Sequence, residues 1–174
     1  NPAGIDCGTD CTESYLAGTV VTLTATPQAG SSFAGWSGSG CAGSGTCQVT
    51  MSAARSVTAT FNLIPDTTPE PFSFTPQTGV ALGATVTSNA ITPTGYNTAA
   101  ALSVANGQYS IGCTGSFTAS ASTLSPGQSV CVRHTASANP STMVTTTLTI
   151  GGVNGTFSST TLPAYPLTVG RDCS

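Results

Sequence analysis

Residues 19–26 read Thr19-Val-Val-Thr-Leu-Thr-Ala-Thr26, in which apolar and polar side chains largely alternate until Pro27 follows. A two-residue period is that of a β-strand, because successive side chains point to opposite faces of a sheet. The same period recurs in Gln48-Val-Thr-Met51 and in Ser56-Val-Thr-Ala-Thr-Phe61. The first part of the chain therefore predicts three strands, and the fold class it indicates is all-β.

A glycine-rich segment separates the first two of these strands. It reads Gly35-Trp-Ser-Gly-Ser-Gly-Cys-Ala-Gly-Ser-Gly-Thr-Cys47. Glycine weakens the interior of a strand and favours turns. The segment predicts a turn region that a disulfide between Cys41 and Cys47 clamps.

A proline-rich stretch follows, Leu63-Ile-Pro-Asp-Thr-Thr-Pro-Glu-Pro71. Proline removes an amide donor and favours an extended backbone. We expect residues 63–71 to be a short, semi-rigid linker after a small module of residues 1–62.

Short strand patterns separated by turn signals fill residues 72–162. One of the turn signals is Pro76-Gln-Thr-Gly79. Strands at this spacing predict an immunoglobulin-like sandwich, and residues 163–174 are left as a C-terminal tail. The expected strands are Phe72–Phe74, Ala84–Thr87, Ala90–Thr92, Ala101–Val104, Tyr109–Ile111, Val130–Arg133, Thr145–Ile150 and Thr156–Ser158.

The composition excludes several classes of function. Lys and Arg together number 3, all of them Arg, against 6 acidic residues. Because no basic face can neutralise a phosphate backbone, nucleic-acid binding is not expected. No apolar run is long enough to span a bilayer, and no signal-peptide pattern opens the sequence, so we expect a mature chain that does not cross a membrane.

The 7 cysteines indicate an oxidising compartment. Besides Cys41 and Cys47, we expect Cys113 and Cys131 to be joined across neighbouring strands or sheets. Cys7 and Cys11 clamp the opening turn, or one of them pairs with Cys173 of a neighbouring copy. Cys173 is otherwise unpaired or intermolecular. A metal site is the weaker reading, because the spacings differ from zinc knuckles and the chain has 1 His.

The pair Arg133 and His134 is the nearest approach to a catalytic motif. A nucleophile needs an oriented base, and residues 72–162 contain no carboxylate that could orient His134. We therefore expect no catalytic residues, no cofactor and no enzymatic activity.

Residues 1–62 resemble the divergent internalin-type B-repeat of bacterial surface proteins. The resemblance lies in Asn1-Pro-Ala-Gly-Ile-Asp-Cys-Gly8, Gly18-Thr-Val-Val-Thr-Leu-Thr-Ala25, Gly35-Trp-Ser-Gly38 and Val57-Thr-Ala-Thr-Phe61. It implies a small, β-grasp-like module that serves surface display and protein contacts without catalytic residues. Residues 88–92 and 125–133 are similar to immunoglobulin-like repeats of secreted and outer-surface bacterial proteins. A secreted protein of the bacterial cell surface is therefore expected.

One part of the B-repeat pattern lies elsewhere in this sequence. Members of the family usually open with a Tyr-x-Leu-Thr-Val strand. Here the given sequence starts at Asn1 without that strand, and the same pattern occurs in the tail as Tyr165-Pro-Leu-Thr-Val169. This predicts that Tyr165, Leu167 and Val169 form an assembly strand, donated to the module of the next copy in a head-to-tail filament. The strand could instead fold back within its chain, or begin the next repeat of a tandem array.

The alternative function is that of an adhesin, a module of a larger surface protein that binds a glycan or a host protein. On that hypothesis Trp36, with Tyr96 and Tyr109, is a candidate ligand contact, because an indole face can stack on a sugar. In its Gly-Trp-Ser-Gly setting Trp36 is more simply a core aromatic.

Overall fold

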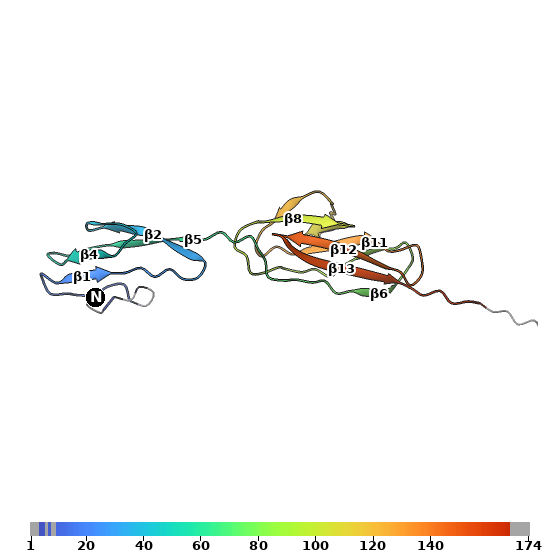
Figure 1. Cartoon of the computed structure of the whole chain (residues 1–174), viewed down its shortest axis with the longest axis horizontal. Coiled ribbons are helices and arrows are strands. Elements are labelled where there is room, and N and C mark those ends of the chain that lie inside the picture. The colour runs from blue at the N-terminus through green and yellow to red at the C-terminus, as the bar shows by residue number, and fades with distance from the viewer. Residues whose placement is uncertain (1–3, 6, 8–9, 168–174) are drawn as a thin grey trace, which may run out of the picture. The chain divides into compact units, whose positions relative to one another are not determined.

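The computed structural model describes residues 4–5, 7 and 10–167 of the chain, which divides into two units, Asn1–Pro65 and Asp66–Ser174. Both units are built from β-strands, and the described residues contain no α-helix (Figure 1). The all-β fold class is therefore confirmed. A search of those residues for a helix long and apolar enough to cross a bilayer finds none.

The first unit contains two small sheets. Strand β1 (Val20–Leu23) pairs antiparallel with β4 (Cys47–Thr50), and Val21 lies opposite Val49. The other sheet has the order β3-β2-β5, all antiparallel. Its strands are β2 (Ser31–Gly38), β3 (Cys41–Gly43) and β5 (Thr58–Leu63).

The second half of β2 and the whole of β3 lie in the glycine-rich segment that the sequence predicts as a turn region. The prediction is wrong for these residues, and the turn between the two strands is confined to residues 39–40. The glycines of the segment allow strands to approach each other closely. A Cβ added at Gly38 would lie 2.6 Å from the carbonyl oxygen of Ser56, and one at Gly35 would lie 3.1 Å from that of Gly43. Glycine within a strand often marks such a close backbone approach.

The core of the first unit is small. Its buried cluster consists of Cys41, Cys47 and Val49. Four partly buried side chains pack against this cluster, namely Leu23, Trp36, Met51 and Val57. Two of the three cluster members are cysteines joined to each other. The disulfide therefore adds stability to a unit that buries little apolar surface.

The second unit is a two-sheet sandwich of the predicted immunoglobulin-like kind. The larger sheet has the order β10-β8-β12-β13-β6, and the smaller has the order β7-β11-β9. Pairing is antiparallel throughout, except that β6 runs parallel to β13. The strands are β6 (Gln77–Val80), β7 (Thr85–Thr87), β8 (Ala100–Ala105), β9 (Gln108–Ile111), β10 (Ser122–Leu124), β11 (Val130–Thr135), β12 (Met143–Ile150) and β13 (Val153–Thr161).

Several local predictions for the sandwich need correction. Strand β6 covers most of the segment that Pro76 and Gly79 suggested to be a turn; it is an edge strand, where proline at one end is tolerated. Residues 72–74 form no strand, and residues 90–92 contribute a single bridge at Ile91. Strand β10 was not predicted.

The sandwich encloses a large apolar core. Leu124, Leu148 and Phe157 are completely buried, and Phe157 packs edge-on against Phe74. The full cluster comprises Phe74, Val86, Tyr96, Ala100, Leu102, Tyr109, Leu124, Val130, Val132, Ala136, Leu148, Ile150 and Phe157. Core residues come from strands of both sheets, as a sandwich requires.

Most of the predicted linker belongs to the second unit. The carbonyl oxygen of Asp66 accepts hydrogen bonds from the amides of Asn97 and Thr98, both at 3.0 Å. The Glu70 amide donates to the carbonyl of Thr94 at 2.8 Å. The unit boundary after Pro65 therefore lies inside the proline-rich stretch, and the residues beyond it are held by the sandwich.

Candidate functional sites

The open edge of β5 is a candidate assembly site in the first unit. Among the described residues β5 pairs with β2 alone. Ala59, Phe61 and Leu63 alternate along the strand and therefore share a face, yet Phe61 is 45 % exposed and Leu63 is 65 % exposed. Phe61 contacts the ring of Phe33 with centroids 5.3 Å apart. The edge thus combines unpaired backbone groups with uncovered apolar side chains.

Trp36 is engaged within the first unit. Its indole Nε1 donates a hydrogen bond of 2.7 Å to the carbonyl of Gly45. The indole also meets Phe33 edge-on, with centroids 5.1 Å apart, and packs against the buried cluster of this unit. These contacts favour the core role of Trp36 over that of a glycan platform.

Two of the predicted disulfides are present. Cys41 is bonded to Cys47, with the Cα atoms 5.6 Å apart, and Cys113 is bonded to Cys131, with the Cα atoms 5.5 Å apart. The second bond joins the segment after β9 to β11, its neighbour in the sheet. Cys7 and Cys11 are exposed, and their pairing stays a prediction.

Residues 165–167, the described part of the predicted assembly strand, are exposed beyond the end of the sandwich. The amide of Leu162 still donates to the carbonyl of Val80 at 3.0 Å. Beyond this bond, Tyr165 is 84 % exposed and Leu167 is 89 % exposed, and neither belongs to a strand. Val169 and Cys173, the other predicted assembly residues, lie outside the described residues.

Arg133 and His134 do not form a catalytic pair. They are consecutive in β11, so their side chains point to opposite faces of the sheet. His134 is buried, its ring lies 5.0 Å from the Phe157 ring, and it faces the interior of the sandwich. The sequence prediction that the two do not cooperate in catalysis rests on the lack of a nearby carboxylate, and the strand geometry adds an independent reason.

The hydrogen bonds around His134 fix its tautomer. Thr146 Oγ1 donates to the carbonyl of Asn106 at 2.7 Å, so it accepts the bond of 2.8 Å from Nδ1–H of His134. Burial lowers the pKa of His134 below its usual value, which favours the neutral ring. In the neutral ring the other nitrogen, Nε2, carries no proton and accepts that of Ser159 Oγ at 2.7 Å. The chain of hydroxyl and imidazole groups thus stabilises a neutral histidine in the core.

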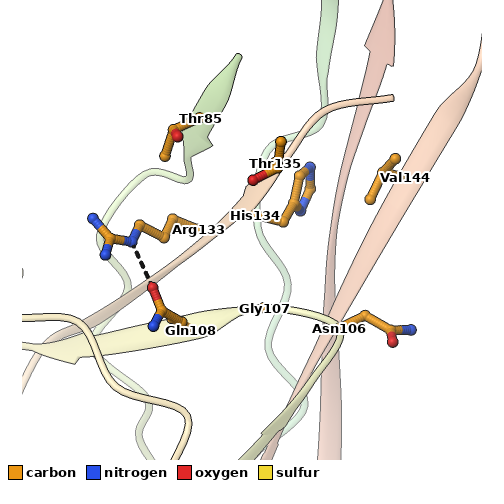
Figure 2. Close-up of a pocket in the computed structure, with 8 residues that line it drawn as sticks. All are labelled: Thr85, Asn106, Gly107, Gln108, Arg133, His134, Thr135 and Val144. Atoms are coloured by element: carbon orange, nitrogen blue, oxygen red, sulfur yellow. Dashed lines mark hydrogen bonds between the residues drawn. The ribbon is translucent and has the colours of Figure 1, made fainter. Parts of the chain in front are cut away.

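Arg133 lies on the outer face of β11 in a pocket of the sandwich (Figure 2). Its guanidinium carbon stands 4.1 Å above the centroid of the Phe117 ring, and its Nε–H donates to Oε1 of Gln108 at 2.9 Å. The other lining residues are Thr85, Asn106, Gly107, His134, Thr135 and Val144. Strand alternation alone predicts that Arg133 points outward. Its contact with Phe117 could not be predicted from the sequence, because Phe117 lies in a loop without a regular pattern.

No group of three or more His, Cys, Asp or Glu side chains suited to one metal ion occurs in the part of the chain that the structure describes. The predicted absence of a metal site or cofactor stays a prediction.

Comparison with known proteins assigns the first unit. Residues 5–65 match the family model described as the divergent InlB B-repeat domain. This confirms the B-repeat resemblance for that segment, and a module of this family is typical of bacterial surface and secreted proteins. No family model identifies the sandwich. Neither the curated proteins nor the solved structures contain a significant match to the chain.

Proposed function

We propose that the chain is a structural subunit of an extracellular bacterial assembly, in which residues 165–169 of one copy add as a strand to the B-repeat module of the next copy. The observation that carries this proposal is the open edge of β5 with its exposed apolar side chains, Phe61 and Leu63.

The β5 edge carries little protection against added strands, since the register shift of the β2–β5 pair lies in β2, between Phe33 and Gly35. Natural edge strands are blunted by charged residues, proline or bulges that turn the edge away. Strand β5 reads Thr58-Ala-Thr-Phe-Asn-Leu63 and contains neither a charged residue nor proline. An edge of this composition readily accepts a further strand by main-chain hydrogen bonding.

The tail segment matches this edge in its pattern. Tyr165, Leu167 and Val169 are spaced by two residues, and so are Ala59, Phe61 and Leu63 on the exposed face of β5. A strand added beside β5 would place its apolar side chains next to those of β5, because side chains of paired strands meet on the same face. Covering Phe61 and Leu63 in this way would remove apolar surface from water.

The tail is also available for such a contact. The exposure of Tyr165 and Leu167 means that the sandwich does not use them. Pro166 removes one amide donor, which a strand at the edge of a sheet tolerates because it is bonded on one side. Since the acceptor and the donor are different surfaces of the same chain, repeated joining is head-to-tail and extends into a filament.

The test separates acceptor from donor. Leu63→Lys blocks the β5 edge and leaves the tail intact, whereas Leu167→Asp blocks the tail and leaves the edge intact. We expect the unaltered chain to form polymers, visible by electron microscopy and by sedimentation, and each variant to remain monomeric. A mixture of the two variants retains one working edge and one working tail, so it should form dimers of one copy each and no longer species.

Leu82→Asp is the matched control, because Leu82 is also an exposed leucine, at 46 %, and belongs to neither surface. It should polymerise as the unaltered chain does. A soluble monomer at high concentration that deletion of residues 163–174 leaves unchanged would contradict the proposal. Nonreducing electrophoresis of the polymer tests whether Cys173 adds an intermolecular disulfide to the joint.

The same joint could also form within one longer polypeptide. A Tyr-x-Leu-Thr-Val segment placed before Asn1 by fusion would then occupy the β5 edge in cis. The fused chain should be monomeric under conditions in which the unfused chain polymerises. If the fusion polymerised equally well, the β5 edge would not be the acceptor.

A further inference from the structure

Arg133 is the single charged residue between Glu70 and Arg171, if His134 is neutral. Among the described residues, no carboxylate forms an ion pair with it, and its side-chain contacts are with Gln108 and Phe117. Most isolated arginines extend into water on a flexible stem, but this one is held in place. A lone cation that the fold immobilises is a feature that the proposed assembly does not use.

Two contacts fix the orientation of the guanidinium, and a disulfide holds the loop that provides one of them. The Phe117 ring supports its face at 4.1 Å, and Gln108 accepts its Nε–H at 2.9 Å. Cys113, in the same loop as Phe117, is bonded to Cys131, which precedes Arg133 by two residues in β11. The disulfide thus ties the loop to the strand that it covers, and holds Phe117 near Arg133.

The fixed guanidinium keeps its strongest donors free. No described residue accepts a hydrogen bond from its two terminal nitrogens, and Figure 2 shows them directed away from Gln108. These paired N–H groups match the two oxygens of a carboxylate, and less freedom is lost on binding when the fork is already oriented. The pocket therefore presents a preorganised site for one carboxylate.

The rest of the pocket indicates the kind of molecule that carries the carboxylate. Thr85, Gln108 and Thr135 offer hydroxyl and amide groups, which hydrogen-bond the hydroxyls of a sugar, while the Asn106 amide is directed away from the guanidinium (Figure 2). Val144 is the one aliphatic side chain of the lining. A protein interface would need several aromatic or aliphatic anchors, whereas this lining offers Val144 alone as an aliphatic one. A polyphosphate or a sulfated polymer would need several cations, and the lining holds one.

We infer that this pocket binds a carboxylated sugar, with the acid group on the terminal nitrogens of Arg133 and the sugar hydroxyls on the surrounding threonine and amide side chains. The inference is independent of strand donation, because it involves the sandwich alone. It gives the sandwich a recognition function beside the structural function of the first unit.

The test is a titration of the whole chain followed by two-dimensional NMR. The chain contains three arginines, so their Nε–H signals are few and can be assigned by substitution. The probes are glucuronate and N-acetylneuraminate, and glucose is the neutral match for glucuronate. We expect at least one of the acids to shift the Nε–H of Arg133 and the amides of Gln108 and Thr135 saturably, with affinity at least about tenfold higher than that of glucose.

Variants distinguish recognition from a structural role. Arg133→Lys keeps the charge but loses the planar fork, so affinity for the acid should fall about tenfold. Phe117→Leu leaves the arginine in place without its support and should weaken binding more mildly. Arg55→Gln, in the first unit, should change nothing. Dispersed amide signals from core residues confirm that each variant is folded.

Three results would overturn the inference. One is the lack of saturable shifts at Arg133 with both acids in the folded chain. Another is equal affinity for glucose. A third is equal affinity for glucuronate and for a short peptide with a single glutamate, since that would show carboxylate pairing without sugar recognition.

Discussion

The two units of this chain close a β-structure around a core by different means. The sandwich buries thirteen apolar side chains in one cluster, whereas the cluster of the B-repeat module has three, two of them disulfide-bonded cysteines. Every buried polar side chain of the described residues also lies in the sandwich. The sandwich is therefore stabilised mainly by its own interior, while the module has a small core that a disulfide supports.

The largest expected loss of stability comes from a substitution in the core of the sandwich. Phe157→Ala removes a fully buried ring that contacts Phe74 and His134. Loss of such a ring should lower the free energy of unfolding of the sandwich by about 3–5 kcal/mol. The chain has 1 Trp, Trp36 in the first unit, so its fluorescence reports on the module alone. In denaturant titrations the Trp36 transition should stay in place while the sandwich transition, followed by NMR, moves to lower denaturant.

Removal of the disulfide in each unit should affect the folding of the module and of the sandwich differently. Converting Cys41 and Cys47 to alanine opens a short loop and should cost about 2–3 kcal/mol. That is a large share of the stability of a module with a small core. Converting Cys113 and Cys131 to alanine costs a similar amount, but the sandwich should stay folded. Trp36 fluorescence and NMR spectra measure the two outcomes; an intact module without its disulfide would show that its core suffices.

A change of pH should affect the sandwich through His134, which has no counterpart in the module. Burial holds the pKa of folded His134 below the ordinary value of 6.5, so the unfolded chain binds the proton more readily. This contribution to stability is fully present above pH 6.5 and is lost as the pH falls toward the folded pKa. The loss should not exceed about 1.4 kcal/mol per pH unit.

His134→Gln supplies the control for this pH dependence, since glutamine keeps a donor and an acceptor but does not titrate. Thermal unfolding between pH 7 and pH 5 should show a weaker pH dependence of the sandwich in this variant. An unchanged slope would mean that another group carries the effect.

The smallest expected changes in stability come from two buried serines of the sandwich. Ser159 and Ser110 are each 1 % exposed, but Ser159 donates to His134 whereas Ser110 Oγ has no hydrogen-bond partner. Ser159→Ala should therefore cost about 1 kcal/mol. Ser110→Ala should be neutral or slightly stabilising, because it removes a buried group that is not satisfied. Equal losses in denaturant titrations would show that Ser110 has an unseen partner.

The sequence predicts some parts of this structure well, for physical reasons. Strand β12 shows a regular two-residue period because one of its faces packs on a core, and its prediction as Thr145–Ile150 agrees with the observed Met143–Ile150. Strand β2 was missed because its glycines serve close pairing with neighbouring strands, a requirement that is visible once the fold places those strands together. Strand β6 was missed because Pro76 signals a turn unless the strand is known to lie at an edge.

Some features of the candidate sites can likewise be predicted from the sequence, and others cannot. The disulfide pairs Cys41–Cys47 and Cys113–Cys131 follow from spacing and strand order. Strand alternation also predicts that Arg133 and His134 point to opposite faces. The contact between Arg133 and Phe117 cannot be predicted in this way, because it depends on the path of a loop. Local patterns therefore predict which face a residue occupies, and the tertiary fold decides what it meets there.

The scarcity of cationic residues bears on how the chain resists proteolysis. Proteases of the trypsin type cleave after Lys or Arg, and between Glu70 and Arg171 the chain offers them the Arg133–His134 bond alone. That bond lies in β11 between β7 and β9, with His134 buried, so a protease cannot draw it out as an extended strand unless the sandwich unfolds. The immunoglobulin-like unit should thus survive intact in a medium rich in such enzymes.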